Sequence, residues 1–275
     1  IPSTRDLYAV SRALEDHHID ALLVIGGYSA YEGIYTMMTE RDRYPAFRIP
    51  TVCIPASIDN NLPGSELSIG TDTALNVIVE AMDKIKESGI ASRRCFVVET
   101  MGRDCGYLAL MSGIAAGAER IYTNEDGISL DDLANDVHWL RESFAHGRRL
   151  FLAVRNENAS HNYTTDFIAR LLEEESHGMY DVRQVVLGHM QQGGSPSPFD
   201  RLLANRLGYR ALNLIDDELA AHQDGSWFIG VNESGMRPCS MDTMPSLIDA
   251  AHRRPREQWW LQLRTIARMV SDEVR

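Results

Sequence analysis

The chain has 275 residues, enough for about two domains at the usual ~150 residues per domain. Hydrophobic residues make up 44% and charged residues 24%, the balance of a folded globular protein and not of a disordered one. The net charge of −12 argues against a nucleic acid or an anionic membrane as partner. No apolar run approaches the ~18 residues of a membrane-spanning helix and no secretory signal is evident, so we expect a cytoplasmic protein.

The cysteines favour the same compartment. Cys53, Cys95, Cys105 and Cys239 lack the spacing of metal ligands, and each lies in or beside an apolar stretch. This pattern is typical of buried free thiols in a reducing environment and not of a disulfide framework.

The chain begins with a predicted helix and continues as an alternation of strands and helices. Ser3 and Asp6 have the spacing of a capping box, and Leu7, Val10 and Leu14 recur at helical intervals. Short apolar runs predict strands at 21–25, 51–54, 95–98, 150–154, 182–187 and, within a less regular stretch at 216–246, at 227–231. Helical patterns occupy 71–86, 107–118, the residues after Ser129, 165–174, 201–215 and the tail after Pro255.

This alternation, with short connections that carry Gly and Pro, predicts an α/β fold with doubly wound, mostly parallel sheets and helices on both faces. Ser129 and Asp132 have capping-box spacing at the start of their helix. In the tail, we expect Trp259, Trp260, Leu263 and Ile266 to pack into the core because they share one helical face.

In a doubly wound sheet, ligands bind beyond the carboxyl ends of the strands, so the residues that follow each strand are candidates for function. Gly26 and Gly27 follow the first strand, where they could admit a ligand to backbone amides or allow tight packing. Asp59 follows the second strand, where its carboxylate could act as a general base or form an Asx turn. Gly102 and Arg103 follow the third strand, where they could hold an anion or cap a helix.

Two later strands add polar residues to this set. Glu157 comes shortly after the run at 150–154, and His189, Gln191 and Gln192 lie in a Gly-flanked loop after the run at 182–187, where they could bind a sugar or a phosphate. Arginines near strand ends could form a positive pocket in this acidic protein, because a guanidinium grips a phosphate or carboxylate in two-pronged fashion.

The motifs, taken in order, resemble those of the ATP-dependent 6-phosphofructokinases of eukaryotic type. The resemblance covers essentially the whole chain and rests on IPASIDNN at 54–61, IGTDTALN at 69–76, ETMGRDCGYLA at 99–109, NYTTDF at 162–167, LGHMQQGGSPSPFDR at 187–201 and RPREQWWLQLR at 254–264. These enzymes are tandem duplications in which the N-terminal half phosphorylates fructose 6-phosphate and the C-terminal half has become an allosteric sugar-bisphosphate site.

The chain is more similar to the C-terminal, regulatory half. Gln192 stands where catalytic halves carry arginine. The resemblance further implies that the family's first strand and its nucleotide loop precede Ile1, that the partner is an N-terminal half, and that the protein is a homo-oligomer, a tetramer by resemblance. The resemblance also divides the chain into two domains. Residues 1–120, joined by a C-terminal segment at about 201–275, form a nucleotide-lobe-like domain, and residues 121–200 form a sugar-phosphate-binding lobe.

Two motifs depart from the catalytic pattern. The family's GGDGS loop, whose aspartate places Mg²⁺, appears as Gly26–Ala30 with Tyr28 at the aspartate position, and the TIDND motif appears as Ser57–Asn61 with Asn61 at the second aspartate. Tyrosine cannot replace a carboxylate on Mg²⁺, which takes hard oxygen ligands. The resemblance therefore implies Mg²⁺ and ATP for the whole enzyme, with neither cofactor expected in this half.

The same resemblance assigns a sugar-phosphate or effector site to one set of residues. The set comprises Ser57, Ile58, Asp59, Asn60, Asn61, Arg94, Met101, Gly102, Arg103, Glu157, Arg183, His189, Met190, Gln191, Gln192 and Arg253. Arg94 and Arg183 would reach the phosphate from a neighbouring subunit, and Arg253 would be a further phosphate ligand. Asp59 matches the catalytic base of the family.

Three functions remain open on these grounds. The first is an allosteric half that binds fructose 2,6-bisphosphate or a related sugar phosphate. The second is an active kinase half with Asp59 as base and Arg103 for charge, against which Tyr28 argues. The third is a degenerate half that serves only subunit assembly, against which the retained arginines argue.

Overall fold

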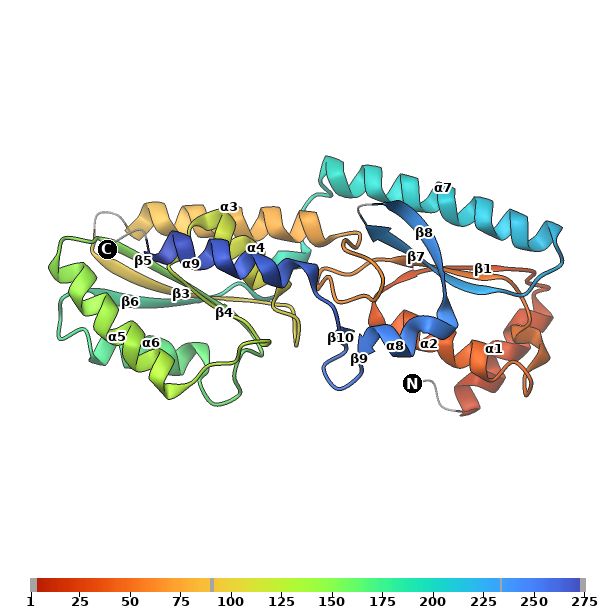
Figure 1. Cartoon of the computed structure of the whole chain (residues 1–275), viewed down its shortest axis with the longest axis horizontal. Helices are drawn as coiled ribbons and strands as arrows, with labels where there is room; N and C mark the ends of the chain where they lie inside the picture. Colours follow the sequence, from red (N-terminus) through yellow and green to blue (C-terminus); the bar gives the residue numbers. More distant parts are fainter. Residues whose placement is uncertain (1–3, 90–91, 233, 273–275) are drawn as a thin grey trace. The chain divides into compact units, whose positions relative to one another are not determined.

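The computed structural model describes residues 4–89, 92–232 and 234–272. Its described part forms two compact units (Figure 1), the first drawn from Ile1–Ser57, Asn61–Gly70 and Pro198–Gln258, the second from Ile58–Asn60, Thr71–Ser197 and Trp259–Arg275. Each unit has its own sheet and its own cores. No helix among the described residues is both long enough and apolar enough to cross a membrane.

The first unit is built on a four-stranded sheet. Its order is β1 (Leu22–Gly26), β2 (Thr51–Pro55), β7 (Ser226–Asn232) and β8 (Gly235–Ser240), with the first three parallel and β8 antiparallel. Every residue of β2 is buried, as expected for a central strand covered on both faces. The α-helices are α1 (Thr4–Asp16), α2 (Tyr28–Thr39), α7 (Pro198–Ala220) and the short α8 (Met244–Leu247). Smaller elements are η1 (Pro45–Phe47), η3 (Met241–Thr243) and the antiparallel pair β9 (Ile248–Asp249) and β10 (Arg254–Pro255).

Helices cover both faces of this sheet. Cys53 and Phe228 pack with α2 and α8 on one face, and Val52, Ile54 and Ile229 pack with α7 on the other. Side chains of adjacent strand positions therefore enter opposite cores, as the two-residue period of a strand requires.

The second unit has a fully parallel four-stranded sheet. Its order is β4 (Arg120–Tyr122), β5 (Leu150–Asn156), β3 (Arg94–Thr100) and β6 (Asp181–Val186). Figure 1 shows α3 (Thr71–Gly89), α4 (Tyr107–Ala116) and α9 (Arg264–Asp272) on one face, and α5 (Leu130–Ala145) and α6 (Thr165–Glu174) on the other. The short helix η4 (Trp259–Leu263) packs into the core on the α3 face. The short helix η2 (Gly188–Gln192) follows β6.

Several local predictions are confirmed. The N–H of Asp132 donates to Ser129 Oγ (3.1 Å) and the N–H of Ser129 donates to Asp132 Oδ2 (2.9 Å), which completes the capping box of α5. Trp260 is 2% exposed and stacks edge-on against Tyr107, so it is a packing residue. Cys53, Cys95 and Cys105 are buried free thiols, and Cys239 is half-buried and free.

Other predictions need correction. The boundary expected at residue 120 lies instead near residue 70, because β3 pairs with β5 and β6 and so carries 71–120 into the second unit, and η4 and α9 also belong there instead of returning to the first unit. Val10 (39% exposed), Trp259 (36% exposed) and Ile266 (45% exposed) do not lie on buried faces. Ser3 lies outside the described residues.

Helix α2 and strands β4 and β8 are among the elements that were not predicted. Helix α2 is rich in aromatic and β-branched residues, whose helix propensity is modest, and it is stabilised by packing around Tyr31 and Ile34. Strand β4 has only three residues. Strand β8 carries Arg237 and Pro238, which suit an edge strand because proline cannot donate to a neighbour.

Candidate functional site

Three loops meet at the carboxyl ends of β5, β3 and β6 in the second unit. Met101, Gly102 and Arg103 follow β3, Glu157 follows β5, and His189 to Gln192 form η2 after β6. Because these strands are parallel neighbours, their ends lie at one edge of the sheet. Most of the site residues predicted in this unit are therefore brought together, at the position where doubly wound sheets bind ligands.

Glu157 and Gln191 hold the β3 loop by its backbone. Glu157 Oε1 accepts hydrogen bonds from the N–H groups of Gly102 (3.1 Å) and Arg103 (2.7 Å), while Gln191 Oε1 accepts from the Met101 N–H (3.1 Å). Gly102 has a φ of 129°, and a Cβ there would lie 2.4 Å from the Cys105 carbonyl oxygen, so the loop requires glycine at this position. The result is a rigid turn whose amides already face a carboxylate oxygen.

Asp59 lies within electrostatic reach of Arg103 and Glu157. Burial raises the pKa of the Asp59 carboxyl above its ordinary value, the positive charge of Arg103 lowers it, and the negative charge of Glu157 raises it again. Asp59 is half-buried, and its carboxyl therefore combines a raised proton affinity with a nearby cation. These are properties of a proton acceptor or of a group that binds a sugar hydroxyl.

Replacement of Asp59 by asparagine should change how stability depends on pH. A carboxyl whose pKa is raised on folding destabilises the folded state as pH rises above its ordinary pKa of 3.8, because the unfolded chain releases the proton first. We expect Asp59→Asn to gain stability relative to wild type as the pH rises above the ordinary pKa of 3.8, as measured by urea unfolding at several pH values from there toward neutrality. A stability difference that stays constant over this range would contradict the assigned environment of Asp59.

Beneath this cluster lies a buried ion pair that the sequence analysis missed. Arg155 is 1% exposed, and its Nη1 donates to Glu99 Oε2 (2.9 Å) and to the Glu157 carbonyl (3.0 Å). The Nη2 atom of Arg155 donates to the Ser160 carbonyl (2.6 Å), and its Nε donates to the Tyr163 carbonyl (3.2 Å). Arg155 is a positioning residue, since it fixes the chain from Glu157 onward. The sequence did contain a signal for this pair. Two apolar strands each end in residues of opposite charge, Glu99 and Arg155, and the structure makes these two register partners.

The remaining residues of this unit lie farther from Glu157 or point elsewhere. Ile58 packs against the core that α3 and α4 form on one face of the sheet, and Asn60 is 4% exposed with a φ of 52°. His189, Met190 and Gln192 are exposed on η2. They are therefore open to a ligand from solvent.

Arg94 lies at the other edge of the sheet, and Arg183 lies two residues in from that edge. They belong to neighbouring strands, and Arg183 is the register partner of Phe96. Arg94 is the first residue of β3 and Thr100 the last, so at ~3.3 Å per residue these ends are roughly 20 Å apart. One phosphate cannot contact both Arg94 and the Glu157 cluster of the same subunit.

The other predicted site residues lie in the first unit. The Arg253 guanidinium lies 4.7 Å from the centre of the Tyr28 ring and donates to Glu32 Oε2 (2.7 Å) and Ser29 Oγ (3.1 Å). The Arg253 carbonyl accepts from Asn61 Nδ2 (3.1 Å), and Ser57 Oγ donates to Asn61 Oδ1 (3.4 Å). Arg253, expected to be a phosphate ligand, is thus engaged by α2 in this structure.

The position that the resemblance gives to a Mg²⁺-binding carboxylate does not fit the ion. Tyr28 is 6% exposed there and begins α2, and burial together with Glu32 raises the pKa of its phenol. The Arg253 cation over its ring would repel a divalent cation, which also needs several oxygen ligands. Across the described part of the chain, no group of three or more His, Cys, Asp or Glu side chains is arranged to hold a metal ion.

The fold and the clustered loops define a doubly wound α/β protein with a polar site beyond its parallel strands. A sequence model of the family described as "Phosphofructokinase" matches residues 2–215. The chain belongs to the phosphofructokinase family.

Relatives of known name support the assignment. The chain is 41% identical over 275 residues to the ATP-dependent 6-phosphofructokinase, platelet type, of Rattus norvegicus, covering 96% of this chain and 35% of that protein. It is 41% identical over 273 residues to the ATP-dependent 6-phosphofructokinase, muscle type, of Homo sapiens, covering 95% of this chain and 35% of that protein. The phosphofructokinase structure from Saccharomyces cerevisiae matches with a TM-score of 0.93 at 33% identity, covering 98% of this chain and 37% of that one. The chain thus spans about a third of the length of these relatives, and the expected fold is confirmed.

Proposed function

We propose that this chain is the regulatory half of an ATP-dependent 6-phosphofructokinase, the glycolytic enzyme that converts ATP and fructose 6-phosphate to ADP and fructose 1,6-bisphosphate. In this role it binds an allosteric sugar phosphate such as fructose 2,6-bisphosphate. The observation that carries the proposal is the meeting of Asp59, Arg103, Glu157 and η2 at one edge of the second sheet. Carboxylates suit the hydroxyls of a sugar, and arginines suit its phosphates.

The first unit supports a loss of nucleotide chemistry. Phosphoryl transfer depends on positioning and on the stabilisation of developing negative charge, to which Mg²⁺ is a main contributor. Tyr28 and Arg253 leave this position unsuited to the ion. A kinase half with Asp59 as base remains the second candidate, favoured by the raised pKa of Asp59 beside Arg103.

The purified chain should not phosphorylate fructose 6-phosphate with MgATP, because its loop after β1 offers Tyr28 where the metal-binding carboxylate belongs. A coupled assay that follows ADP release measures this, with heat-inactivated protein as the blank. Turnover above the blank that disappears in Asp59→Ala would overturn the regulatory assignment and establish the kinase alternative.

Ligand binding should also be linked to assembly. Because Arg94 lies at the opposite edge from Glu157 and Arg183 lies two residues in from that edge, the proposal has a neighbouring subunit complete the phosphate site. A ligand that binds only the assembled form stabilises it by about 2.7 kcal/mol at a hundredfold excess over Kd.

Sedimentation velocity at low protein concentration measures this linkage. The oligomer should persist to lower concentration with fructose 2,6-bisphosphate, and Arg94→Ala should abolish the difference. Tight binding by a dilute monomer would show that the neighbouring subunit supplies no ligand.

A further inference from the structure

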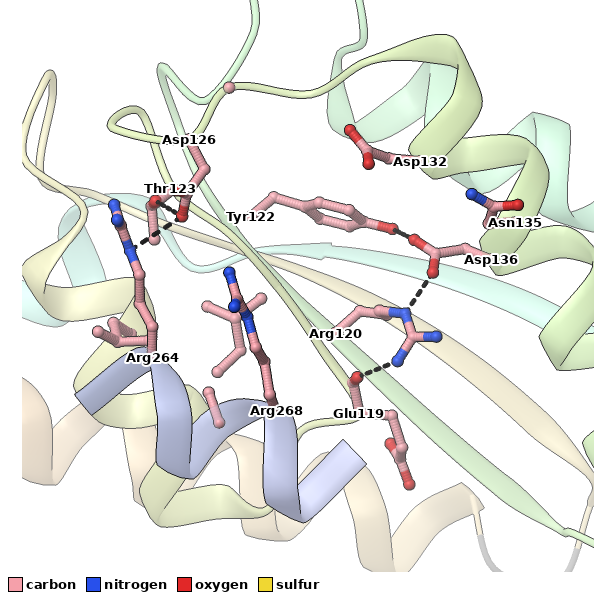
Figure 2. A pocket seen from close by; sticks show the side chains of 14 residues that line it. Glu119, Arg120, Tyr122, Thr123, Asp126, Asp132, Asn135, Asp136, Arg264 and Arg268 are labelled. Carbon is pink, nitrogen blue, oxygen red and sulfur yellow. Dashed lines mark hydrogen bonds and ion pairs between the residues drawn. The ribbon is translucent and has the colours of Figure 1, made fainter. Parts of the chain in front are cut away.

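The cavity between α9 and α5 in the second unit is charged, but its charges pair with one another (Figure 2). Asp136 forms an ion pair with Arg120, and Asp126 forms one with Arg264. Asp132 accepts from Ser129 Oγ (2.6 Å) in the cap of α5. These charges serve the fold of the second unit. A surface with no part in the sugar-phosphate site lies instead in the first unit, on α7.

Helix α7 is apolar on two opposite faces. Its inner face packs on the first sheet through five buried side chains, Leu203, Leu207, Ala211, Leu214 and Ile215. On its outer face, Tyr209 is 72% exposed, Leu202 64%, Leu212 55% and Leu219 39%. Figure 1 shows α7 along the outer side of its sheet. Because a helix that is apolar all round is normally buried, we expect a second surface to cover the outer face.

The outer residues have the heptad spacing of a coiled coil. Counted from Leu202, the positions that would face a partner helix alternate in steps of three and four residues, at 202, 205, 209, 212, 216 and 219. All six side chains are exposed. The two that are not apolar are Asn205 and Asp216. This outer stripe of six residues therefore has the pattern of a helix–helix contact.

The outer stripe is complementary to itself when two copies of α7 run antiparallel. With Tyr209 of one copy opposite Leu212 of the other, the same register sets Leu202 opposite Leu219 and Asn205 opposite Asp216. Every layer is then apolar against apolar or amide against carboxylate. In a parallel pair, Asp216 would face Asp216 of the other copy, and the two like charges would repel.

Charges beside the outer stripe favour the same direction. The amino-terminal half of α7 carries Arg206 and Arg210, and the carboxyl-terminal half carries Asp216 and Asp217. An antiparallel pair places each basic half against an acidic half. In this register Arg206 lies within two residues of Asp217 of the second copy, roughly 3 Å along the helix axis. Such pairs at the rim of a contact select its orientation more than they add affinity.

We propose that the outer stripe of α7 docks against the outer stripe of a second copy of this chain, antiparallel about a twofold axis that passes between residues 210 and 211. A twofold contact uses the same surface on both copies, and the outer stripe contains both members of every matched pair. The contact lies in the first unit and does not depend on the sugar-phosphate site of the proposed function.

Disulfide cross-linking of the double variant Leu202→Cys/Leu219→Cys locates the contact. In the antiparallel pair, position 202 of one copy lies beside position 219 of the other, whereas within one helix the two positions are roughly 26 Å apart, too far for a disulfide. Mild oxidation followed by peptide mass spectrometry should therefore identify a link between 202 and 219 of different chains. Links of 202 to 202 and of 219 to 219 would indicate a parallel pair. Absence of any link would show that a different segment or partner covers α7, and either result would overturn the proposal.

Sedimentation velocity measures the strength of the contact. Tyr209→Glu puts a charge at the centre of the outer stripe and should raise the dissociation constant of the pair roughly tenfold to a hundredfold. Tyr8→Glu is the matched control, because Tyr8 is also an exposed tyrosine on a helix of the first unit, and it should leave association unchanged. Equal weakening by the two variants would contradict a specific contact through α7.

Exchange of the polar pair tests the register. Asn205→Asp alone should weaken association, because it sets two carboxylates face to face. Asn205→Asp combined with Asp216→Asn restores an amide opposite each carboxylate and should return association to near the wild-type level. All of these side chains are exposed, and cooperative thermal unfolding verifies that the variants fold. Failure of the double variant to recover would refute the antiparallel register.

Discussion

Replacement of Arg155 by methionine is expected to lower the free energy of unfolding by about 3–5 kcal/mol, because it leaves the partner of a buried ion pair without its countercharge. Arg155 is 1% exposed and pairs with Glu99, whose carboxylate would lose that partner. The carbonyls of Ser160 and Tyr163 would lose their donor as well. Equilibrium unfolding in urea measures the difference.

Arg170→Met is the matched control. Arg170 pairs with Asp166 on α6, but its side chain is 80% exposed, and exposed ion pairs contribute about 0–1 kcal/mol. The control should therefore change stability by less than about 1 kcal/mol. If the two variants lost the same unfolding free energy, the buried ion pair of Arg155 would contribute no more than an exposed one. That result would contradict the role of Arg155 in positioning Glu157.

Arg183→Ala is expected to weaken the binding of fructose 2,6-bisphosphate to the assembled protein roughly tenfold to a hundredfold, since it removes a charge-assisted contact worth about 1.5–3 kcal/mol. In the structure, Arg183 is the exposed third residue of β6, with contacts to the Val182 carbonyl (2.7 Å) and to Asp181 (3.7 Å) on its own strand. Equilibrium dialysis against the ligand measures the affinity.

Arg149→Ala controls for the loss of charge alone. Arg149 is exposed at the same edge of the sheet, directly before β5, and its carbonyl accepts from the Arg94 N–H (3.0 Å). Its replacement removes the same charge and should leave affinity nearly unchanged. If both variants weaken binding equally, the ligand is attracted by the overall positive charge at this edge of the sheet and not by a direct contact with Arg183.

Much of the fold could be predicted because its strands are short apolar runs and its helices show regular periodicity. The run at 51–54 is a fully buried central strand, and Ser129 and Asp132 cap α5 as their spacing indicates. Helix α2 could not be predicted this way. Its stability comes from tertiary contacts such as Tyr31 against Phe228, whose ring centres are 5.7 Å apart across nearly two hundred residues of sequence.

The site was predictable in its location and less so in its contacts. Strand-end position indicates that Gly102, Glu157 and Gln191 lie near one another, because neighbouring parallel strands end at one edge. It cannot show that Glu157 holds the amides of Gly102 and Arg103, which depends on loop geometry. The contact of Arg253 with Tyr28 joins residues far apart in the chain, so no local pattern reports it.

The proposed regulatory role requires that this chain bind a sugar phosphate although it lacks a position suited to Mg²⁺. Calorimetric titration of fructose 2,6-bisphosphate into the wild-type assembled protein, without Mg²⁺ or ATP, tests it most directly. We expect saturable binding with one site per chain, since Asp59, Arg103, Glu157 and η2 lie together in the second unit. Absence of binding heat at ligand concentrations far above those of protein, or binding that appears only with Mg²⁺ and ATP, would contradict it.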